Sequence, residues 1–422
     1  MISSRLKSLF YTNENKRLVA NFFSLVVLRG FQFLIPLITL PYLVRTIGIE
    51  NFGLVNFALS LCIYFGAIIQ FGFGITATRE ISRHRDDPIK LAQIYSVTLT
   101  ASISLALVSA ALFTAIVLSF EKFNNNLDLY FFTFVFIVFQ SLFPIWFFQG
   151  MEKMKYITFL SLSASVFFLV TLFVFVKQKD DFVLVPMLNA ISAMMTFIFA
   201  LVLIKKQFKI DYMIPEWQEI KKIYTEGNHA FITQLVPNLY TNSVTFFLGF
   251  FAGNAVVGLF VSASKIIDAV GSTAYIFSNA CLPLLSRNID RHNAFQKIML
   301  AVGLALTIVL IAATEKITTF MYGSINNIVT LYVQALALAI PLIFIQITYG
   351  SNYLMLTGNE KQFKSIVLLA SVGSLFYSTP LIYIYGAWGA ICTLVITRAI
   401  ISFSTYRAYL ANETRKRNSF YV

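Results

Sequence analysis

The stretch IYSVTLTASISLALVSAALFTAIVLSF, residues 94–120, contains no charged side chain and consists mostly of apolar and small residues. At a rise of about 1.5 Å per residue, a helix of this length spans the roughly 30 Å hydrocarbon core of a bilayer. The whole chain has the same character, since 58% of its 422 residues are hydrophobic, 12% are charged and the mean hydropathy is +0.76. A soluble fold cannot bury so large an apolar fraction. The sequence therefore predicts an integral membrane protein and excludes a soluble enzyme.

Hydropathy predicts twelve membrane-spanning helices and therefore an all-α fold. Barrel strands are excluded because the apolar runs repeatedly reach about 20 residues. The predicted spans are residues 19–42, 52–77, 94–120, 129–149, 157–176 and 183–204, then 230–252, 256–285, 298–314, 328–356, 366–385 and 387–409. A polar segment separates the two sets. We therefore expect an N-terminal six-helix lobe over residues 1–204, a linker over 205–229 and a C-terminal six-helix lobe over 230–422.

The distribution of Lys and Arg over alternate inter-helix segments predicts the orientation. One set of segments, which includes both termini and the linker, holds 24 of the 32 basic residues, and the opposite loops hold five. The positive-inside rule then places both termini in the cytoplasm. Because the net charge of +13 is spread over seven segments and forms no single stripe, no nucleic-acid partner is expected.

The two halves of the chain carry a weak internal repeat. GIENFGL at 48–54 matches GNAVVGL at 253–259 at an offset of 205 residues, and GMEK at 150–153 matches GNEK at 358–361 at an offset of 208. Two matches at equivalent turns indicate pseudo-symmetric lobes. Such lobes are typical of transporters that hold their substrate near the bilayer midplane.

Four charged residues lie inside predicted spans: Arg29, Lys265, Asp268 and Arg398. Each costs about 2.5–3.5 kcal/mol at a helix centre, so each requires a reason to be there. Asp268 and Lys265 have the i, i+3 spacing of a structural ion pair, which competes with a functional role for both. No acidic partner is visible for Arg29 or Arg398, so we expect them to line a water-filled cavity, with snorkelling or carbonyl pairing as the alternative. A cavity with guanidinium groups suits a phosphate-bearing substrate.

Polar uncharged residues recur on overlapping faces of the seventh predicted span. Asn238 and Asn242 are the two amides among them. We expect them to contact sugar hydroxyls, and hydrogen bonds between helices are the alternative.

Catalytic and metal chemistry find little support in the sequence. His84, His229 and His292 fall in or beside the predicted cytoplasmic segments, without metal-ligand spacing. There is no glycine-rich phosphate loop, so an ATP-driven pump is not expected. The three cysteines are far apart in apolar runs, which excludes a disulfide scaffold. We expect neither an enzyme nor a bound cofactor.

Several motifs resemble those of O-antigen flippases. In the first half they are PLITLPYLVRTIG at 36–48, ENFGL at 50–54, FGFGITATREI at 71–81 and PIWFFQGMEKM at 144–154. In the second half they are LYT at 239–241, VGLF at 257–260, SKII at 264–267 and YGAWGA at 385–390. The resemblance runs over nearly the whole chain.

This resemblance implies a member of the multidrug, oligosaccharidyl-lipid and polysaccharide exporter superfamily, with a central cationic cavity. Such flippases move an undecaprenyl-diphosphate-linked oligosaccharide repeat unit across the bacterial inner membrane by alternating access. By this resemblance Arg29 and Arg398 bind the diphosphate or acidic sugars, Lys265 assists them, and Asp268 is the membrane acid available for coupling to protons or sodium. The implied partners are the lipid-linked oligosaccharide, membrane lipids, and the polysaccharide polymerase with its chain-length machinery.

Two other functions stay open. A multidrug cation exporter shares the implied fold, but it needs an acid in the N-terminal lobe, whose predicted spans offer Arg29 and no carboxylate. A membrane polysaccharide polymerase or acyltransferase needs a catalytic cluster and large outer loops, and the predicted outer loops are short. The sugar composition of the substrate, the driving force, the oligomeric state and the order in which the lobes close are not encoded in any motif of the chain.

Overall fold

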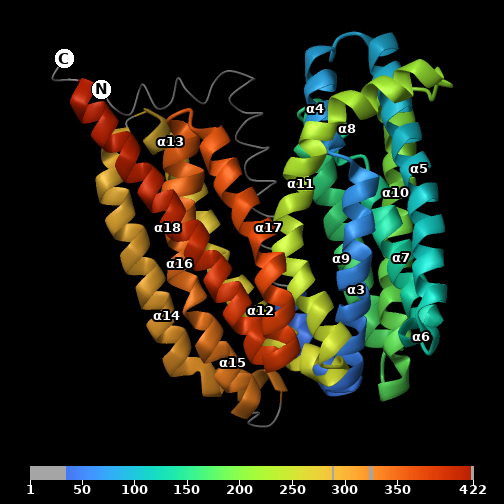
Figure 1. Ribbon diagram of the computed structural model, residues 1–422. Helices are drawn as coiled ribbons and strands as arrows, with labels where there is room; N and C mark the ends of the chain where they lie inside the picture. Colours follow the sequence, from blue (N-terminus) through green and yellow to red (C-terminus); the bar gives the residue numbers. More distant parts are fainter. Residues whose placement is uncertain (1–34, 288, 323–326, 420–422) are drawn as a thin grey trace. The chain divides into compact units, whose positions relative to one another are not determined.

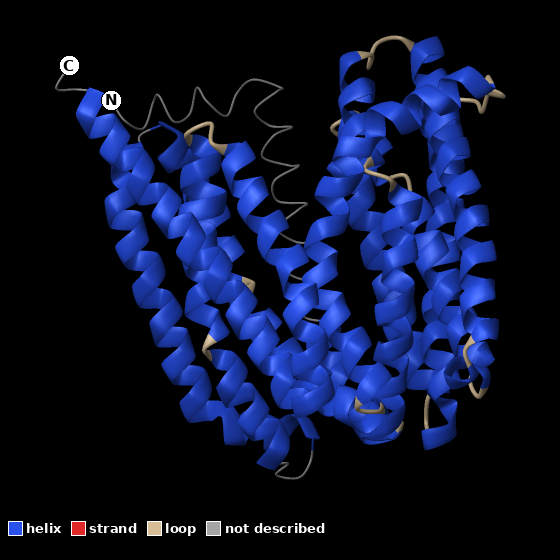
Figure 2. Ribbon diagram, viewed as in Figure 1, coloured by secondary structure: helices blue, strands red, loops and turns tan. Residues whose placement is uncertain are grey.

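The computed structural model describes residues 35–287, 289–322 and 327–419, and all elements in these ranges are helices (Figure 2). They form two compact units. One unit contains Leu61–Leu235. The other contains Leu40–Ser60 together with the described residues from Val236 onward.

The first unit is built from the second part of α3 (Gly48–Gln70), the first part of α11 (Trp217–Phe251) and the helices between them (Figure 1). These are α4 (Phe73–Arg83), α5 (Pro88–Ser119), α6 (Glu121–Asn124), α7 (Leu127–Leu142), α8 (Ile145–Gly150), α9 (Met154–Phe175), the 3₁₀ turn η1 (Lys179–Val183) and α10 (Leu184–Phe208). In this unit α10 packs along α7 and α9, and α4 packs on α8. The core between them is rich in aromatic side chains, including the fully buried Phe147 and Phe148.

The second unit contains the rest of α3 and α11 and every later helix. These later elements are α12 (Asn254–Gly271), α13 (Thr273–Arg287), the 3₁₀ turn η2 (Ile289–Arg291), α14 (His292–Tyr322), α15 (Asn327–Ala337), α16 (Ala339–Ile345), the π-helix η3 (Gln346–Leu354), α17 (Glu360–Tyr385) and α18 (Ala387–Ser419). Helices α17 and α18 lie side by side, and α12 packs on α15 (Figure 1).

Ten candidate membrane spans occur within the described residues. They cover ten of the twelve predicted spans, among them residues 298–314, which lie inside the 31-residue helix α14. Of the other two, residues 19–42 lie mostly outside the described part, and residues 230–252 fall in α11. The chain is therefore a multi-pass membrane protein, while the number twelve and the cytoplasmic position of the termini stay predictions.

The outward faces of the long helices are apolar, as contact with lipid requires. Large hydrophobic side chains are exposed in series at helical spacing. The series include Phe159, Val166, Val170 and Val174 on α9, and Ile298, Leu304, Ile308 and Ile311 on α14.

The span predicted as continuous over residues 52–77 is interrupted. Phe71 and Gly72 both have positive φ, at 41° and 73°, and they separate α3 from α4. Gly72 tolerates this conformation because it lacks a Cβ, whereas for Phe71 it is strained. A Cβ on Gly72 would also lie 2.6 Å from the Cβ of Ala230 on α11, so the break occurs where two helices approach closely.

The predicted polar linker, residues 205–229, is helical at both ends. Helix α10 continues to Phe208 and α11 begins at Trp217, so residues 209–216 alone connect the two helices. The C-cap of α10 is Lys209, which has the left-handed conformation usual after a helix C-terminus, with φ 56°. The lobe boundaries expected at residues 204 and 230 stay predictions.

Candidate functional site

The structure describes the side chains of four of the six residues assigned from the sequence. Arg29 lies outside the described residues, and Asn238 lies in α11 at a position whose side chain is not described. The structure describes the side chains of Asn242 on α11, Lys265 and Asp268 on α12, and Arg398 on α18. Asn242 is half-buried, and its amide donates to the hydroxyl of Thr241 at 3.5 Å.

Asp268 and Arg398 are brought together in the second unit. The Arg398 Nη2 donates to Asp268 Oδ1 across 3.4 Å between α18 and α12. The Arg398 side chain is 11% exposed and the Asp268 side chain is 56% exposed, so the acid lies on the accessible side of the pair. The other terminal nitrogen, Arg398 Nη1, is buried and has no hydrogen-bond partner in the described part of the chain. A buried cation is thus neutralised on one side and keeps one donor open on the other.

This geometry corrects one expectation and bears on an alternative that the sequence left open. Arg398 has an acidic partner, and the sequence could not show it because the two residues are 130 positions apart. Asp268 pairs with Arg398 and not with Lys265 one turn away on α12. Lys265 is exposed and has no ion pair among the described residues.

A buried polar cluster, which the sequence does not indicate, surrounds the π-helix η3. The Ser278 hydroxyl donates to Asn352 Oδ1 at 2.9 Å, and His292 Nε2 lies 3.1 Å from the Thr348 carbonyl oxygen. Asn352 Nδ2 and His292 Nδ1 are buried without a hydrogen-bond partner among the described atoms. Rings of Tyr349, Tyr353 and Tyr409 enclose the imidazole. Since π-helices are frequent at functional sites, this cluster is a further candidate site.

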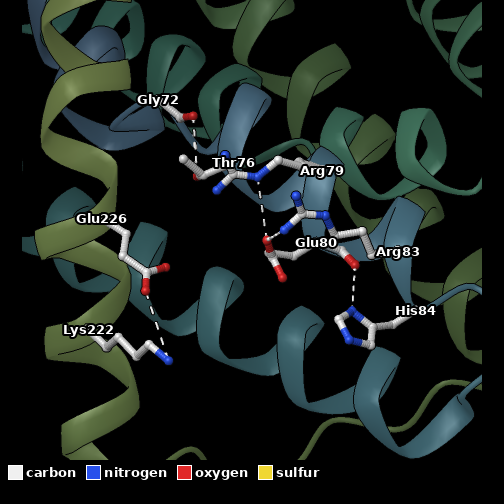
Figure 3. Close-up of polar contacts among 8 residues, drawn as sticks. All are labelled: Gly72, Thr76, Arg79, Glu80, Arg83, His84, Lys222 and Glu226. Carbon is white, nitrogen blue, oxygen red and sulfur yellow. Dashed lines mark hydrogen bonds and ion pairs between the residues drawn. The ribbon is translucent and has the colours of Figure 1, made fainter.

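A second group missed from the sequence lies on α4 in the first unit (Figure 3). Glu80 pairs with two arginines. Its Oε1 accepts a hydrogen bond from Arg83 Nη1 at 3.3 Å and lies 3.4 Å from Arg79 Nε in an ion pair. The Arg79 and Arg83 side chains are 55% and 63% exposed, so they present their guanidinium groups to the surroundings. His84 Nδ1 lies 2.9 Å from the Glu80 carbonyl oxygen. The signal in the sequence is the run TREISRHR at 78–85, whose charges entered the topology prediction alone.

The opposite face of α4 is held firmly by its neighbours. Ile81 is buried, and a Cβ on Gly150 of α8 would lie 2.6 Å from its side chain. After the helix ends, Arg85 Nε donates to the Gly150 carbonyl oxygen at 2.7 Å, and its Nη2 lies 2.5 Å from the Glu152 carboxylate. The next helix, α5, begins at Pro88 with Asp87 as its N-cap, whose carboxylate accepts from two backbone nitrogens.

Helix α11 flanks the start of α4. The Phe71 ring stacks on Phe231 at 4.8 Å and meets the Tyr224 ring edge-on at 5.4 Å. Tyr224 lies before the predicted span of α11, and burial raises the pKa of its hydroxyl. That hydroxyl is 2.7 Å from Ser104 Oγ and donates to the Ala101 carbonyl oxygen at 2.9 Å. These contacts fix α11 beside the strained Phe71.

No group of three or more His, Cys, Asp or Glu side chains within the described ranges is arranged to hold a metal ion.

With this geometry established, comparison with known proteins decides the family. The family described as "Polysaccharide biosynthesis protein" matches residues 18–289. The chain belongs to the polysaccharide biosynthesis protein family. Two relatives, from Escherichia coli (strain K12) and Shigella dysenteriae, are each named "Putative O-antigen transporter". Each is 26% identical to this member of the family, over 92% of the chain and 96% of the first relative, and over 90% of the chain and 97% of the second.

Solved structures show that this polysaccharide biosynthesis protein shares its fold with known transporters. An inward-facing multidrug resistance MATE family transporter of the MOP superfamily matches with a TM-score of 0.65 and 14% identity, covering 91% of the chain and 96% of that structure. The lipid II flippase MurJ, in an inward closed conformation, matches with a TM-score of 0.64 and 14% identity, covering 93% of the chain and 87% of that structure. The all-α membrane fold expected from the sequence is confirmed.

Proposed function

We propose that this membrane protein is a flippase for lipid-linked oligosaccharide repeat units of a bacterial surface polysaccharide, O-antigen or a related polymer. The observation that carries the proposal is the end-to-end match to two relatives named as O-antigen transporters. The fold adds support because MurJ, which shares it, is itself named as a lipid flippase. The carrier in this proposal is undecaprenyl diphosphate and the location is the bacterial inner membrane.

The residues of the second unit supply chemistry suited to such a substrate. Arg398 keeps a buried donor, Nη1, without a partner in the described chain, and Lys265 is exposed one turn before Asp268. Phosphate oxygens accept charge-assisted hydrogen bonds from both kinds of cation. In the proposal Arg29, Lys265 and Arg398 bind the diphosphate or acidic sugars, and Asn238 and Asn242 contact sugar hydroxyls.

Asp268 has the chemistry of a coupling acid in this proposal. Its carboxylate is more than half exposed and contacts a cation that is nearly buried. Binding of a proton or of sodium to Asp268 weakens its hold on Arg398, and release restores it. Transport then proceeds by alternating access without a covalent step, so the protein acts as a transporter and not as an enzyme. The polysaccharide polymerase and its chain-length machinery receive the product.

The test is deletion of the gene in its host, followed by measurement of the lipid-linked repeat unit in each leaflet and of surface polysaccharide. We expect repeat units to accumulate on the cytoplasmic side, surface polymer to be lost, and wild-type protein to restore it. Complementation with Arg29→Ala at normal protein level is expected to fail.

Repeat units that still reach the periplasmic leaflet and stay unpolymerised would refute flipping and favour a polymerase. Unchanged polysaccharide together with increased sensitivity to cationic drugs would favour a multidrug exporter. Full activity of Arg29→Ala would remove that residue from the site.

A further inference from the structure

We infer that α4 carries a binding site for the diphosphate group of an isoprenoid-linked lipid, formed by Arg79 and Arg83, with Glu80 as an internal substitute for the ligand. Its residues belong to the first unit, whereas Lys265, Asp268 and Arg398 belong to the second. The inference rests on the proposed function, since it assigns the place where the lipid-linked substrate is first bound on the side predicted to be cytoplasmic.

The geometry of α4 arranges the two arginines for one ligand. Arg79 and Arg83 are four residues apart, so their side chains leave the helix on the same face, with about 5–6 Å between their Cβ atoms. Both guanidinium groups converge on the Glu80 carboxylate, at 3.4 Å and 3.3 Å (Figure 3). An anion that replaces this carboxylate therefore contacts both forks at once.

The position along the chain suits an amphiphile. Arg79 and Arg83 occupy the last two turns of the candidate span Gly48–Arg83. Ile75, one turn before Arg79 on the same face and toward the apolar part of the span, is 55% exposed. An apolar residue followed by two guanidinium groups matches a lipid whose hydrocarbon chain leads to a phosphorylated head group.

The site is built on a supported element. The buried face of α4 holds Phe73, Thr76, Ala77 and Ile81, and Thr78 Oγ1 lies 3.3 Å from the Trp146 carbonyl oxygen of α8. The strained backbone of Phe71 and the close contact of Gly72 with α11 fix the start of the helix. Strain of this kind is retained where the surroundings impose it and often marks functional segments. Arg79 and Arg83 thus project from a helix whose other faces are already committed to packing.

Charge balance selects a diphosphate over an ordinary phospholipid. Two arginines facing one carboxylate leave one net positive charge, and the arginine pair by itself offers two forks. A phosphodiester brings one negative charge and can occupy one fork, whereas a diphosphate brings at least two charges on adjacent phosphates. Displacement of the Glu80 carboxylate is favourable for a diphosphate, because each guanidinium group then binds its own phosphate.

The first measurement is binding of farnesyl diphosphate to the full chain in phosphatidylcholine nanodiscs. Arg79→Gln/Arg83→Gln is expected to raise the Kd about tenfold, because both forks are lost. Arg79→Lys/Arg83→Lys keeps the charge and is expected to raise it about threefold, since an ammonium cannot form the fork. Lys205→Gln/Lys206→Gln is the matched control, because it removes two positive charges from exposed positions on the same predicted side.

Glu80→Gln provides a test that loss of folding cannot imitate. It removes the internal anion and leaves both arginines in place, so farnesyl diphosphate should bind about threefold more tightly. An unchanged or weaker affinity in this variant overturns the role of Glu80 as a substitute ligand.

Competition separates the two sources of a lipid phosphate. Nanodiscs with phosphatidylglycerol in place of part of the phosphatidylcholine should leave the affinity for farnesyl diphosphate within twofold, on the order of experimental scatter. Displacement by phosphatidylglycerol means that the site takes membrane phospholipid and overturns the inference. An equal loss of affinity for farnesyl diphosphate in the lysine control and in the arginine variant would mean that binding depends on general charge attraction. That result would also overturn the inference.

The outcome for the inference is distinguishable from the outcome for the proposed function. Wild-type protein that restores surface polysaccharide but binds farnesyl diphosphate no better than Arg79→Gln/Arg83→Gln refutes the α4 site and leaves the flippase intact. Binding that depends on both arginines in a protein that fails to move repeat units refutes the flippase and leaves a diphosphate site.

Discussion

Gly53 and Gly258 lie at a reciprocal close contact of α3 and α12. A Cβ on Gly53 would overlap the Asn254 carbonyl oxygen, and a Cβ on Gly258 would overlap the Ile49 carbonyl oxygen. Ile49 and Asn254, like Gly53 and Gly258, are 205 positions apart, which is the offset of the sequence repeat. The two copies of the repeated motif therefore contact each other through the glycines that define it.

The glycine contact predicts that Gly53→Ala or Gly258→Ala destabilises the protein by about 2–3 kcal/mol, because backbone atoms cannot move aside as a flexible side chain can. Thermal unfolding of the purified protein in detergent measures the effect. Gly373→Ala is the control, since a Cβ at that position would have no atom within 4 Å. This substitution also replaces a glycine in a helix interior, which raises stability by up to about 1 kcal/mol. A wild-type melting temperature for Gly258→Ala would contradict the close contact.

The Arg398 pair predicts an asymmetric double-mutant cycle. The single variant Asp268→Asn leaves a nearly buried guanidinium group without an acidic partner. It should therefore lower stability more than the double variant Arg398→Gln/Asp268→Asn, which removes both charges. Because Asp268 is 56% exposed, the coupling energy should be about 1 kcal/mol and not the value of a fully buried pair. Thermal unfolding of the four proteins measures it, and strict additivity would show that the pair contributes nothing.

Lys265 separates function from stability on α12. It is exposed and has no ion pair in the described chain, so Lys265→Gln should leave the melting temperature unchanged. If Lys265 contacts the diphosphate, the same variant should lower restoration of surface polysaccharide about tenfold, a loss typical of one charge-assisted bond. Lys316→Gln, which removes a lysine from the opposite predicted side, serves as the control. Normal restoration by Lys265→Gln would remove Lys265 from the site.

The buried hydrogen bond between Ser278 and Asn352 predicts a partner-dependent effect. Asn352 Nδ2 already has no hydrogen-bond partner among the described atoms, and Ser278→Ala also removes the donor to Asn352 Oδ1. Leaving this buried amide unsatisfied costs about 1–3 kcal/mol of stability. Ser278→Ala/Asn352→Leu removes the unsatisfied group and should recover much of the loss. Ser119→Ala, which deletes an exposed hydroxyl on α5, should change the melting temperature little. A double variant less stable than Ser278→Ala would contradict this account.

Lys209 at the end of α10 predicts a stabilising change. Its φ of 56° is left-handed, a conformation that glycine adopts without the penalty of a Cβ. Lys209→Gly should therefore raise stability by about 0.5–1 kcal/mol, and Lys209→Val should lower it. Lys206→Gly, in the helical last turn of the same helix, is the control and should be destabilising. A lower melting temperature for Lys209→Gly than for wild type would contradict the assignment of the helix end.

Hydropathy predicted the spans well because the cost of exposing backbone and charge to lipid acts on every residue of a long window. The break at Phe71 and Gly72 escaped the same method, since a window average cannot resolve two residues. It depends on the contact of Gly72 with Ala230, which lies far away in the sequence.

The polar contacts were harder to predict than the helices. The charges of Arg398 and Asp268 identified both residues as unusual, but their partnership depends on which faces of α12 and α18 meet. Arg79, Glu80 and Arg83 form a local group, yet their positive charge was already explained by membrane orientation. The buried cluster at Asn352 and His292 has no counterpart in spacing or composition, because it depends on the π-helical geometry of η3.

The assignment of Leu40–Ser60 to the unit formed by the second half of the chain has a consequence for recombination. A hybrid joined in the 209–216 loop between two members of the family would inherit α3 from one parent and α12 from the other, so the glycine contact would be assembled from mismatched parents. Exchanging residues 40–60 together with the second half keeps that contact intact. Each compact unit is therefore encoded by discontinuous parts of the gene. Functional natural or laboratory hybrids should carry two crossovers before residue 61, one on each side of residues 40–60.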